Sequence, residues 1–99
     1  MPNWTFLSNH GQVLLCIARD PSVRLREIGA QVGITERAAH RIVGELVDAG
    51  YLVRKRHGRR NSYTITTDRS LPDPLARDRS IGDLLGVLAA TPRGPPGDG

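Results

Sequence analysis

The chain has 99 residues, enough for one small domain, and its formal net charge is +4. Ten Lys and Arg stand against five Asp and Glu in residues 1–67, but four against five in residues 68–99, so the excess positive charge favours a polyanionic partner for the first part. The single cysteine excludes an internal disulfide, and the absence of a long apolar run predicts a cytoplasmic protein with no membrane contact.

The first expected element is a helix that ends near Arg19. Ser8 or Asn9 can cap it, and Asp20-Pro21 ends it because the residue before proline avoids helical angles. Trp4 and Phe6 precede the helix, and we expect them to cover the core or a partner subunit. The buried side of the helix is expected to comprise Leu7, Val13, Leu14 and Ile17.

Two closely spaced helices are expected next, at about Leu25–Val32 and Thr35–Ala49. Gly33 permits a tight turn between them, and Gly50 follows the second helix, where a left-handed residue often ends a helix. Two helices joined by a short glycine-containing turn form the DNA-binding helix-turn-helix pattern, although an ordinary helical hairpin has the same spacing. The second helix carries an apolar stripe of Ala39, Ile42, Val43, Leu46 and Ala49.

The opposite face of the second helix is polar and slim. Arg37, His40, Arg41 and Gly44 recur there at helical spacing, and arginine can bond guanine edges in a major groove. Thr35 is the expected N-cap and a possible phosphate contact. We therefore predict that this helix reads DNA, with candidate contacts at Thr35, Glu36, Arg37, Ala38, His40 and Arg41.

Two strands around a basic turn are expected after Gly50. The segments YLVRKR and NSYTIT are rich in β-branched and aromatic residues, and the HGRRN between them suits a hairpin. Val23–Leu25 is a weaker candidate for a third strand. A positive hairpin placed after a helix-turn-helix predicts contact with DNA backbone or minor groove. The candidate residues are Arg54, Arg56, His57, Arg59, Arg60 and Asn61.

The composition changes after Asp68. An irregular connector is expected there, followed by a helix that Ser80 caps, and the segment 91–99 is expected to be disordered. The helix carries a leucine-rich stripe, which either packs on its own domain or contributes to a homodimer; we favour the second. The candidate dimerisation residues are Trp4, Phe6, Ile81, Leu84, Leu85 and Leu88.

Three motifs occur in a familiar order: GITERA at 33–38, LVDAGYL at 46–52 and GRRNSY at 58–63. Together they resemble MarR-like bacterial winged-helix transcription regulators over Trp4–Ile65, about two-thirds of the chain. The resemblance implies double-stranded DNA binding as a homodimer, with the helix after the turn reading bases and the wing holding the backbone. Proteins of this kind are usually longer, with terminal helices that form a ligand crevice, so a small-molecule effector is not expected here.

These observations predict an α+β fold: a small winged helix-turn-helix domain with a three-helix core, a two- or three-stranded wing and an extra C-terminal helix. Residues 1–67 form the DNA-binding domain, 68–90 the connector and dimerisation helix, and 91–99 the tail. Sequence-specific regulation is the leading function; a non-specific nucleoid-type DNA binder and a protein-interaction winged helix are the alternatives. The chain shows no paired catalytic groups, no phosphate-binding glycine loop and no histidine cluster, so no enzyme, metal or cofactor is expected, and Cys16 is read as a buried, inert thiol.

Overall fold

The computed structural model describes residues 2–89. The chain divides into two units, Met1–Ile65 and Thr66–Gly99, and each is considered by itself. The first unit contains α1 (Asn9–Arg19), α2 (Leu25–Val32), α3 (Glu36–Asp48), β1 (Leu52–His57) and β2 (Arg60–Ile65). The second contains a short 3₁₀ helix (Pro74–Ala76) and α4 (Ile81–Leu88). The tail expected at 91–99 lies outside the described residues.

Helix α1 begins and ends where the sequence predicts. The Ser8 side chain accepts a hydrogen bond from the backbone N–H of Gly11, and Asp20 follows the last helical residue. The apolar residues of one face, Val13, Leu14 and Ile17, are buried, whereas Leu7 is half-buried. Trp4 and Phe6 do not cover the core: their side chains are 58% and 93% exposed, and they pack edge-to-face on each other.

The turn between α2 and α3 is held by backbone bonds to one residue. The N–H groups of Gly33 and Ile34 both donate to the carbonyl oxygen of Gly29, at 2.8 and 2.9 Å. Gly33 has φ = 86°, a left-handed conformation that favours glycine. Thr35 then caps α3, because its Oγ1 accepts from the N–H of Ala38 at 3.0 Å. The chain thus changes direction within three residues, and α3 begins as a separate helix.

Helix α3 ends in a Schellman motif. Gly50 has φ = 87°, and its N–H donates to the carbonyl of Val47 while the N–H of Tyr51 donates to that of Leu46. The apolar stripe of this helix is buried at Ala39, Ile42, Val43 and Leu46. The predicted fifth residue of the stripe, Ala49, is exposed. It is the C-cap of the helix, and its side chain no longer faces the core.

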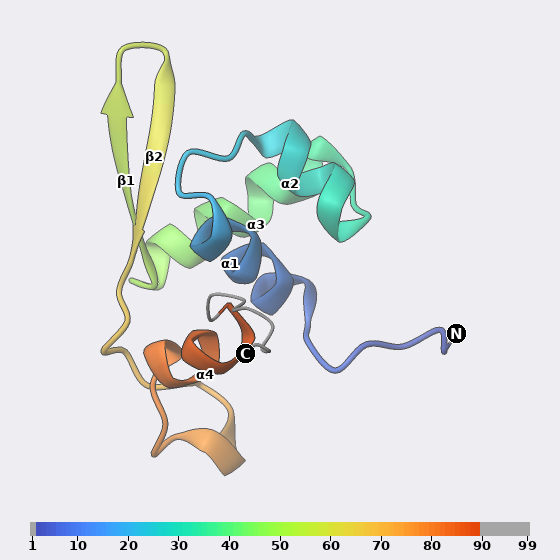
Figure 1. The fold of residues 1–99 in the computed structure, drawn as a ribbon, viewed down its shortest axis with the longest axis vertical. Coiled ribbons are helices and arrows are strands. Elements are labelled where there is room, and N and C mark those ends of the chain that lie inside the picture. The colour runs from blue at the N-terminus through green and yellow to red at the C-terminus, as the bar shows by residue number, and fades with distance from the viewer. Residues whose placement is uncertain (1, 90–99) are drawn as a thin grey trace, which may run out of the picture. The chain divides into compact units, whose positions relative to one another are not determined.

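Strands β1 and β2 form a two-stranded antiparallel hairpin. Leu52 pairs with Ile65 at its base and His57 with Arg60 at its tip, with Gly58 and Arg59 in the turn. Gly58 has φ = 62°, as the first central residue of a type II′ turn requires. Leu52 and Tyr63 are buried, whereas every residue from Val53 to Arg60 is exposed. The hairpin therefore roots in the core and projects beyond the helices (Figure 1).

No third strand forms at Val23–Leu25 within the described residues, so that expectation is wrong. Val23 is buried, and its N–H closes a turn onto the carbonyl of Asp20. Leu25 is already the first residue of α2. One hydrogen bond is made where a third strand would pair with β2: the N–H of Tyr63 donates to the carbonyl of Pro21 at 3.0 Å.

The second unit is held by a capping box and by backbone pairing. Ser80 Oγ accepts from the N–H of Asp83, and the Asp83 carboxylate accepts from the N–H of Ser80 at 2.9 Å. These bonds lower the pKa of Asp83, the bond from the Ser80 backbone most of all. Ser70 forms a bridge with Ser80, and Gly82 donates to the carbonyl of Thr67 at 2.8 Å. The residues before α4 are thereby fastened to its first turn.

Candidate nucleic-acid interface

The outer face of α3 is polar and sterically open. Arg37, His40 and Arg41 are exposed, Ala38 and Gly44 are half-buried, and a Cβ built on Gly44 would meet nothing within 4 Å. Glu36 occupies the first turn, where the helix dipole favours a negative charge. Since the buried stripe faces the other way, the core holds this helix firmly while its arginine face remains accessible.

Arg41 is oriented by a carboxylate one helical turn further on. Its guanidinium donates to Glu45 at 3.2 and 3.4 Å, and Glu45 also lies 2.7 Å from the Nε2 of His10 on α1. The bond with His10 is the main cause that lowers the pKa of Glu45, and Arg41 adds to it. The sequence analysis did not include Glu45 or His10, because their proximity depends on how α1 crosses α3.

The Glu45 contacts predict a pH-dependent stability difference. A lowered pKa in the folded chain means that Glu45 stabilises the fold above its ordinary pKa of 4.5 and loses this effect as the pH falls through the lowered value. The melting temperature of the wild type should therefore exceed that of Glu45→Gln at pH 7, and the gap should narrow as the pH falls below 4.5. A gap that stays the same throughout an acid titration would contradict the assignment.

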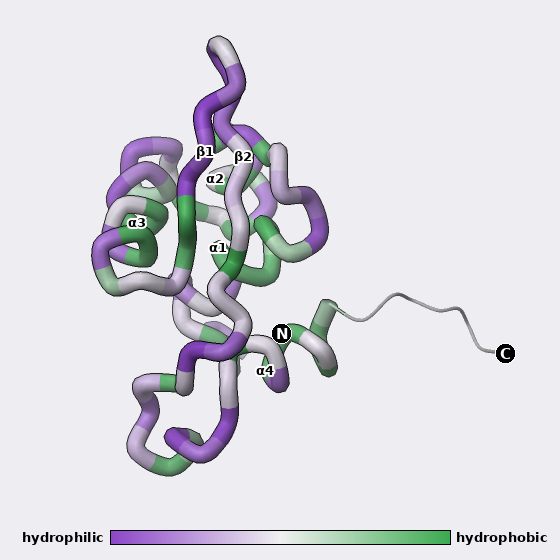
Figure 2. The backbone as a smooth tube through the Cα atoms, turned by 90° about the vertical axis from the view of Figure 1, so that its left-hand side faces the viewer, coloured by the Kyte–Doolittle hydropathy of each residue, from purple (hydrophilic) through white to green (hydrophobic). Residues whose placement is uncertain are grey.

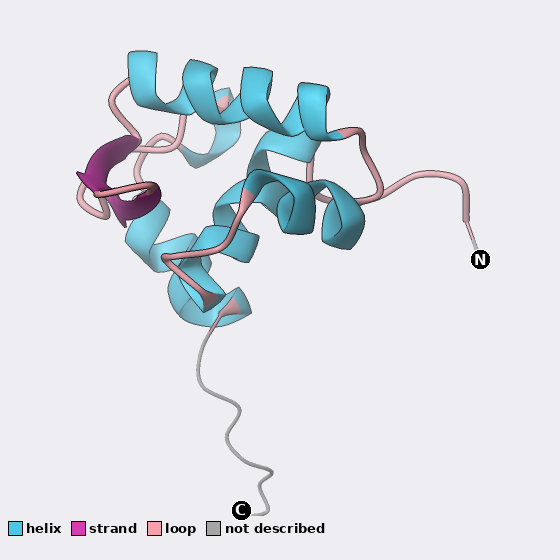
Figure 3. Ribbon diagram, turned by 90° about the horizontal axis from the view of Figure 1, so that it is seen from above, coloured by secondary structure: helices cyan, strands magenta, loops and turns pink. Residues whose placement is uncertain are grey.

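The hairpin presents its basic residues along an exposed and hydrophilic outer half (Figure 2). Arg56 is tied to the turn, since its Nε donates to the carbonyl of Gly58 at 3.2 Å. His57 lies 3.1 Å from the hydroxyl of Ser62. Arg54, Arg59 and Arg60 extend from the same hairpin and are exposed. Figure 3 looks along the hairpin and shows its two strands beside α3.

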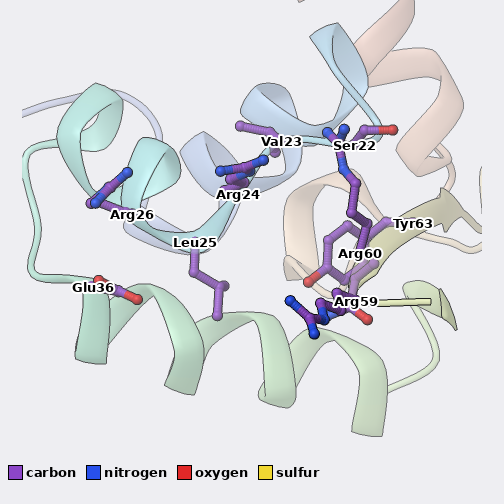
Figure 4. Close-up of a pocket in the computed structure, with 10 residues that line it drawn as sticks. Ser22, Val23, Arg24, Leu25, Arg26, Glu36, Arg59, Arg60 and Tyr63 are labelled. Atoms are coloured by element: carbon purple, nitrogen blue, oxygen red, sulfur yellow. The ribbon is translucent and has the colours of Figure 1, made fainter. Parts of the chain in front are cut away.

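A cavity of about 490 Å³ lies between the hairpin and the two helices of the helix-turn-helix. Arg24 and Arg26 border it from the start of α2, Arg59 and Arg60 from the hairpin, and Glu36 from the start of α3 (Figure 4). We call this cavity the arginine cleft. The start of α3 and the basic hairpin therefore border a common space, but the predicted base-reading residues Arg37, His40 and Arg41 do not line it.

Arg24 and Arg26 were not among the predicted DNA-binding residues. They precede the turn in sequence and belong to no basic run, so only the fold places them opposite the hairpin. Both are exposed. A signal that could have indicated them is the pair of arginines at 24 and 26, which flank the half-buried Leu25 at the expected start of a helix.

The described residues contain no group of three or more His, Cys, Asp or Glu that could hold a metal ion. Burial raises the pKa of the Cys16 thiol, which donates to Oε1 of Gln31 at 3.0 Å. A neutral, bonded thiol is a poor nucleophile. Among residues 2–89, no helix is long and apolar enough to cross a membrane.

The predicted dimerisation residues differ in exposure. In the first unit, Trp4 and Phe6 are largely exposed. In the second, Ile81 and Leu85 are buried within the single chain, Leu84 is half-buried, and Leu88 is 36% exposed. Val87, which was not predicted, is 78% exposed. The stripe of α4 is thus only partly available to a second copy.

A family model described as the MarR family matches residues 5–60. No curated protein matches the chain. The MarR family protein Rv2887 of Mycobacterium tuberculosis, solved in complex with salicylic acid, is 25% identical with a TM-score of 0.51, over 61% of this chain and 47% of that one. The PcaV transcriptional regulator of Streptomyces coelicolor, solved with its natural ligand, is 22% identical with a TM-score of 0.54, over 89% of this chain and 64% of that one. The chain therefore spans less than two thirds of either protein, and the second likeness concerns the fold alone.

Proposed function

The chain belongs to the MarR family, and from this membership we propose that it regulates transcription by binding double-stranded DNA in a sequence-specific manner. Helix α3 enters the major groove, where Arg37, His40 and Arg41 reach base edges. The hairpin holds the adjacent backbone or minor groove with Arg54, Arg56, Arg59 and Arg60. His57 and Asn61 lie at the same end of the hairpin and are secondary contacts.

The observation that carries this proposal is the shared space of the arginine cleft. Its walls include Glu36 at the start of α3 and Arg59 and Arg60 of the hairpin, so one duplex can meet both elements at once. The first unit also carries the chain's excess of positive charge. Arg24 and Arg26 at the start of α2 line the same cavity, so basic side chains from two separate elements converge there, which a protein-interaction surface would not require.

A competition experiment distinguishes the candidate functions. We would select a preferred duplex from a random pool and then measure how well it competes with random DNA for the full chain. A regulator should prefer the selected duplex by at least about 10³-fold. Equal competition would instead indicate the non-specific nucleoid-type binder. The absence of binding to any duplex at low salt would favour the protein-interaction module.

A homodimer is the proposed functional form, since a two-fold axis would place two α3 helices in successive major grooves. Trp4 and Phe6 supply an exposed aromatic pair in the first unit, and Val87 and Leu88 supply exposed apolar side chains in the second. Exposed aromatic groups of this size are typical of surfaces that a partner covers. The two solved neighbours are complexes with salicylic acid and with a natural ligand, respectively, and we propose no effector for this chain.

Phe6→Ala should shift the chain from dimer to monomer without unfolding it. Because Phe6 is 93% exposed, the single chain loses little packing, so the melting temperature extrapolated to low protein concentration should hardly change. Sedimentation velocity over a concentration series measures the shift. Leu75→Ala is the matched control, since Leu75 is fully exposed but was not assigned to the interface. Equal dissociation constants for the wild type and Phe6→Ala would remove Phe6 from the interface.

A further inference from the structure

The arginine cleft has the features of an anion-binding site. The DNA contacts proposed for the outer face of α3 and for the hairpin do not account for all of its arginines. Four guanidinium groups border it, from two elements that are far apart in sequence, and one carboxylate, Glu36, stands at its other wall. Val23 and Tyr63 also line the cavity, and both are buried residues of the core. The cleft thus combines an apolar floor with a cationic rim, and the rim suits the phosphates of a sugar-phosphate chain.

We propose that the arginine cleft binds the backbone of one DNA strand, with Arg24 and Arg26 on its phosphates from one side and Arg59 and Arg60 from the other. This inference rests on the proposed function and deepens it, because it adds a third DNA-binding element, the start of α2. From the sequence, backbone contacts were expected only from the hairpin and Thr35.

The geometry of a duplex supports this assignment. A helix in the major groove and a hairpin at the adjacent minor groove lie on opposite sides of the strand that separates those two grooves. That strand must then pass between the two protein elements. The arginine cleft lies between the hairpin and the starts of α2 and α3, and Figure 4 shows Arg24 and Arg26 on one side of it with Arg59 and Arg60 on the other.

Asn61 provides an independent indication of a bound group. It also lines the cleft, and its Oδ1 is buried without a hydrogen-bond partner in the part of the chain that the structure describes. A buried acceptor left unpaired is costly, so such atoms in folded proteins usually have a partner. A rotation of the Asn61 side chain on binding would turn this oxygen toward the cleft, where a water on a phosphate oxygen would donate one hydrogen to each.

The position of Glu36 determines which side of the cleft a DNA strand would occupy. Its carboxylate would repel phosphates, whereas the arginines attract them, so the strand is held toward α2 and the hairpin. Glu36→Gln should therefore strengthen binding to every duplex several-fold, independent of its sequence. Equal or weaker binding by Glu36→Gln would show that phosphates do not pass near this wall.

The decisive test measures the salt dependence of binding with the full chain and a fixed duplex. Each lost phosphate contact should lower the slope of log affinity against log salt concentration by about 1, so Arg24→Gln and Arg26→Gln should each flatten it. Arg77→Gln, an equal change of charge at an exposed residue outside the first unit, should leave the slope unchanged. Thermal melting confirms that each variant is folded.

The outcomes separate this inference from the proposed function. A wild-type slope that Arg24→Gln and Arg26→Gln lower no more than Arg77→Gln would overturn the cleft assignment and leave a DNA-binding regulator intact. A wild type that binds no duplex would overturn both. As a positional check, ethylation of single phosphates should block wild-type binding at the strand between the two grooves, and this block should weaken in the Arg24→Gln, Arg26→Gln double variant.

Discussion

Gly29→Ala is expected to lower the free energy of unfolding by about 1–3 kcal/mol, although the same exchange usually favours a helix. A Cβ at this position would lie 2.8 Å from the carbonyl oxygen of Ile34 and 3.3 Å from the backbone N of Glu36. Both are backbone atoms at the turn. The turn cannot move aside easily, because the N–H groups of Gly33 and Ile34 donate hydrogen bonds to the carbonyl of Gly29. The methyl group must therefore push α3 away from α2.

Gly44→Ala is the matched control for this prediction. Gly44 also lies inside a helix, but a Cβ there meets nothing within 4 Å, so the variant should gain about 0.5–1 kcal/mol. Urea unfolding followed by circular dichroism compares the two variants with the wild type. If Gly29→Ala were as stable as Gly44→Ala, the close contact between α2 and the turn could not be the cause of destabilisation, and the prediction would be contradicted. Gly44→Ala should also weaken DNA binding, because its methyl group lies on the proposed groove face.

The local elements of the first unit could be predicted because short-range signals determine them. Ser8 and Thr35 cap helices at the predicted residues, and Gly33 and Gly50 have the left-handed angles expected at helix ends. Hydrophobic spacing identified the buried face of α3 as far as Leu46. These features depend on residues within about one helical turn, so a single sequence carries enough information to place them.

Features that depend on packing between elements could not be predicted in this way. The sequence shows Gly29 as a helix-weakening residue, and only the position of the turn explains it. Arg24 and Arg26 join the hairpin arginines across a cavity that the chain forms only when folded. The strand expected at Val23–Leu25 was wrong because Leu25 begins α2, as the helix expected at about Leu25–Val32 also requires, and the two residues before it are too few for a paired strand.

Arg41→Ala is expected to reduce the preference for the selected duplex by about 1–3 kcal/mol, provided that Arg41 reads a base in the major groove. The variant should remain folded, because Arg41 is exposed and its ion pair with Glu45 at 3.2 Å is a solvent-exposed one that contributes little to stability. Competition between the selected duplex and single-base variants of it measures the preference, base pair by base pair.

Arg41→Lys distinguishes base reading from simple attraction to phosphate. Lysine keeps the charge but lacks the planar fork that bonds two acceptors of guanine, so preference should fall while the salt dependence stays close to that of the wild type. Glu45→Gln adds a second comparison, since it removes the carboxylate that holds Arg41 toward His10. If Glu45 orients Arg41 for one base, this variant should lose preference in the same base pair as Arg41→Ala. If both variants instead change the affinity for all duplexes equally, Arg41 contacts backbone, and base reading must come from Arg37 or His40.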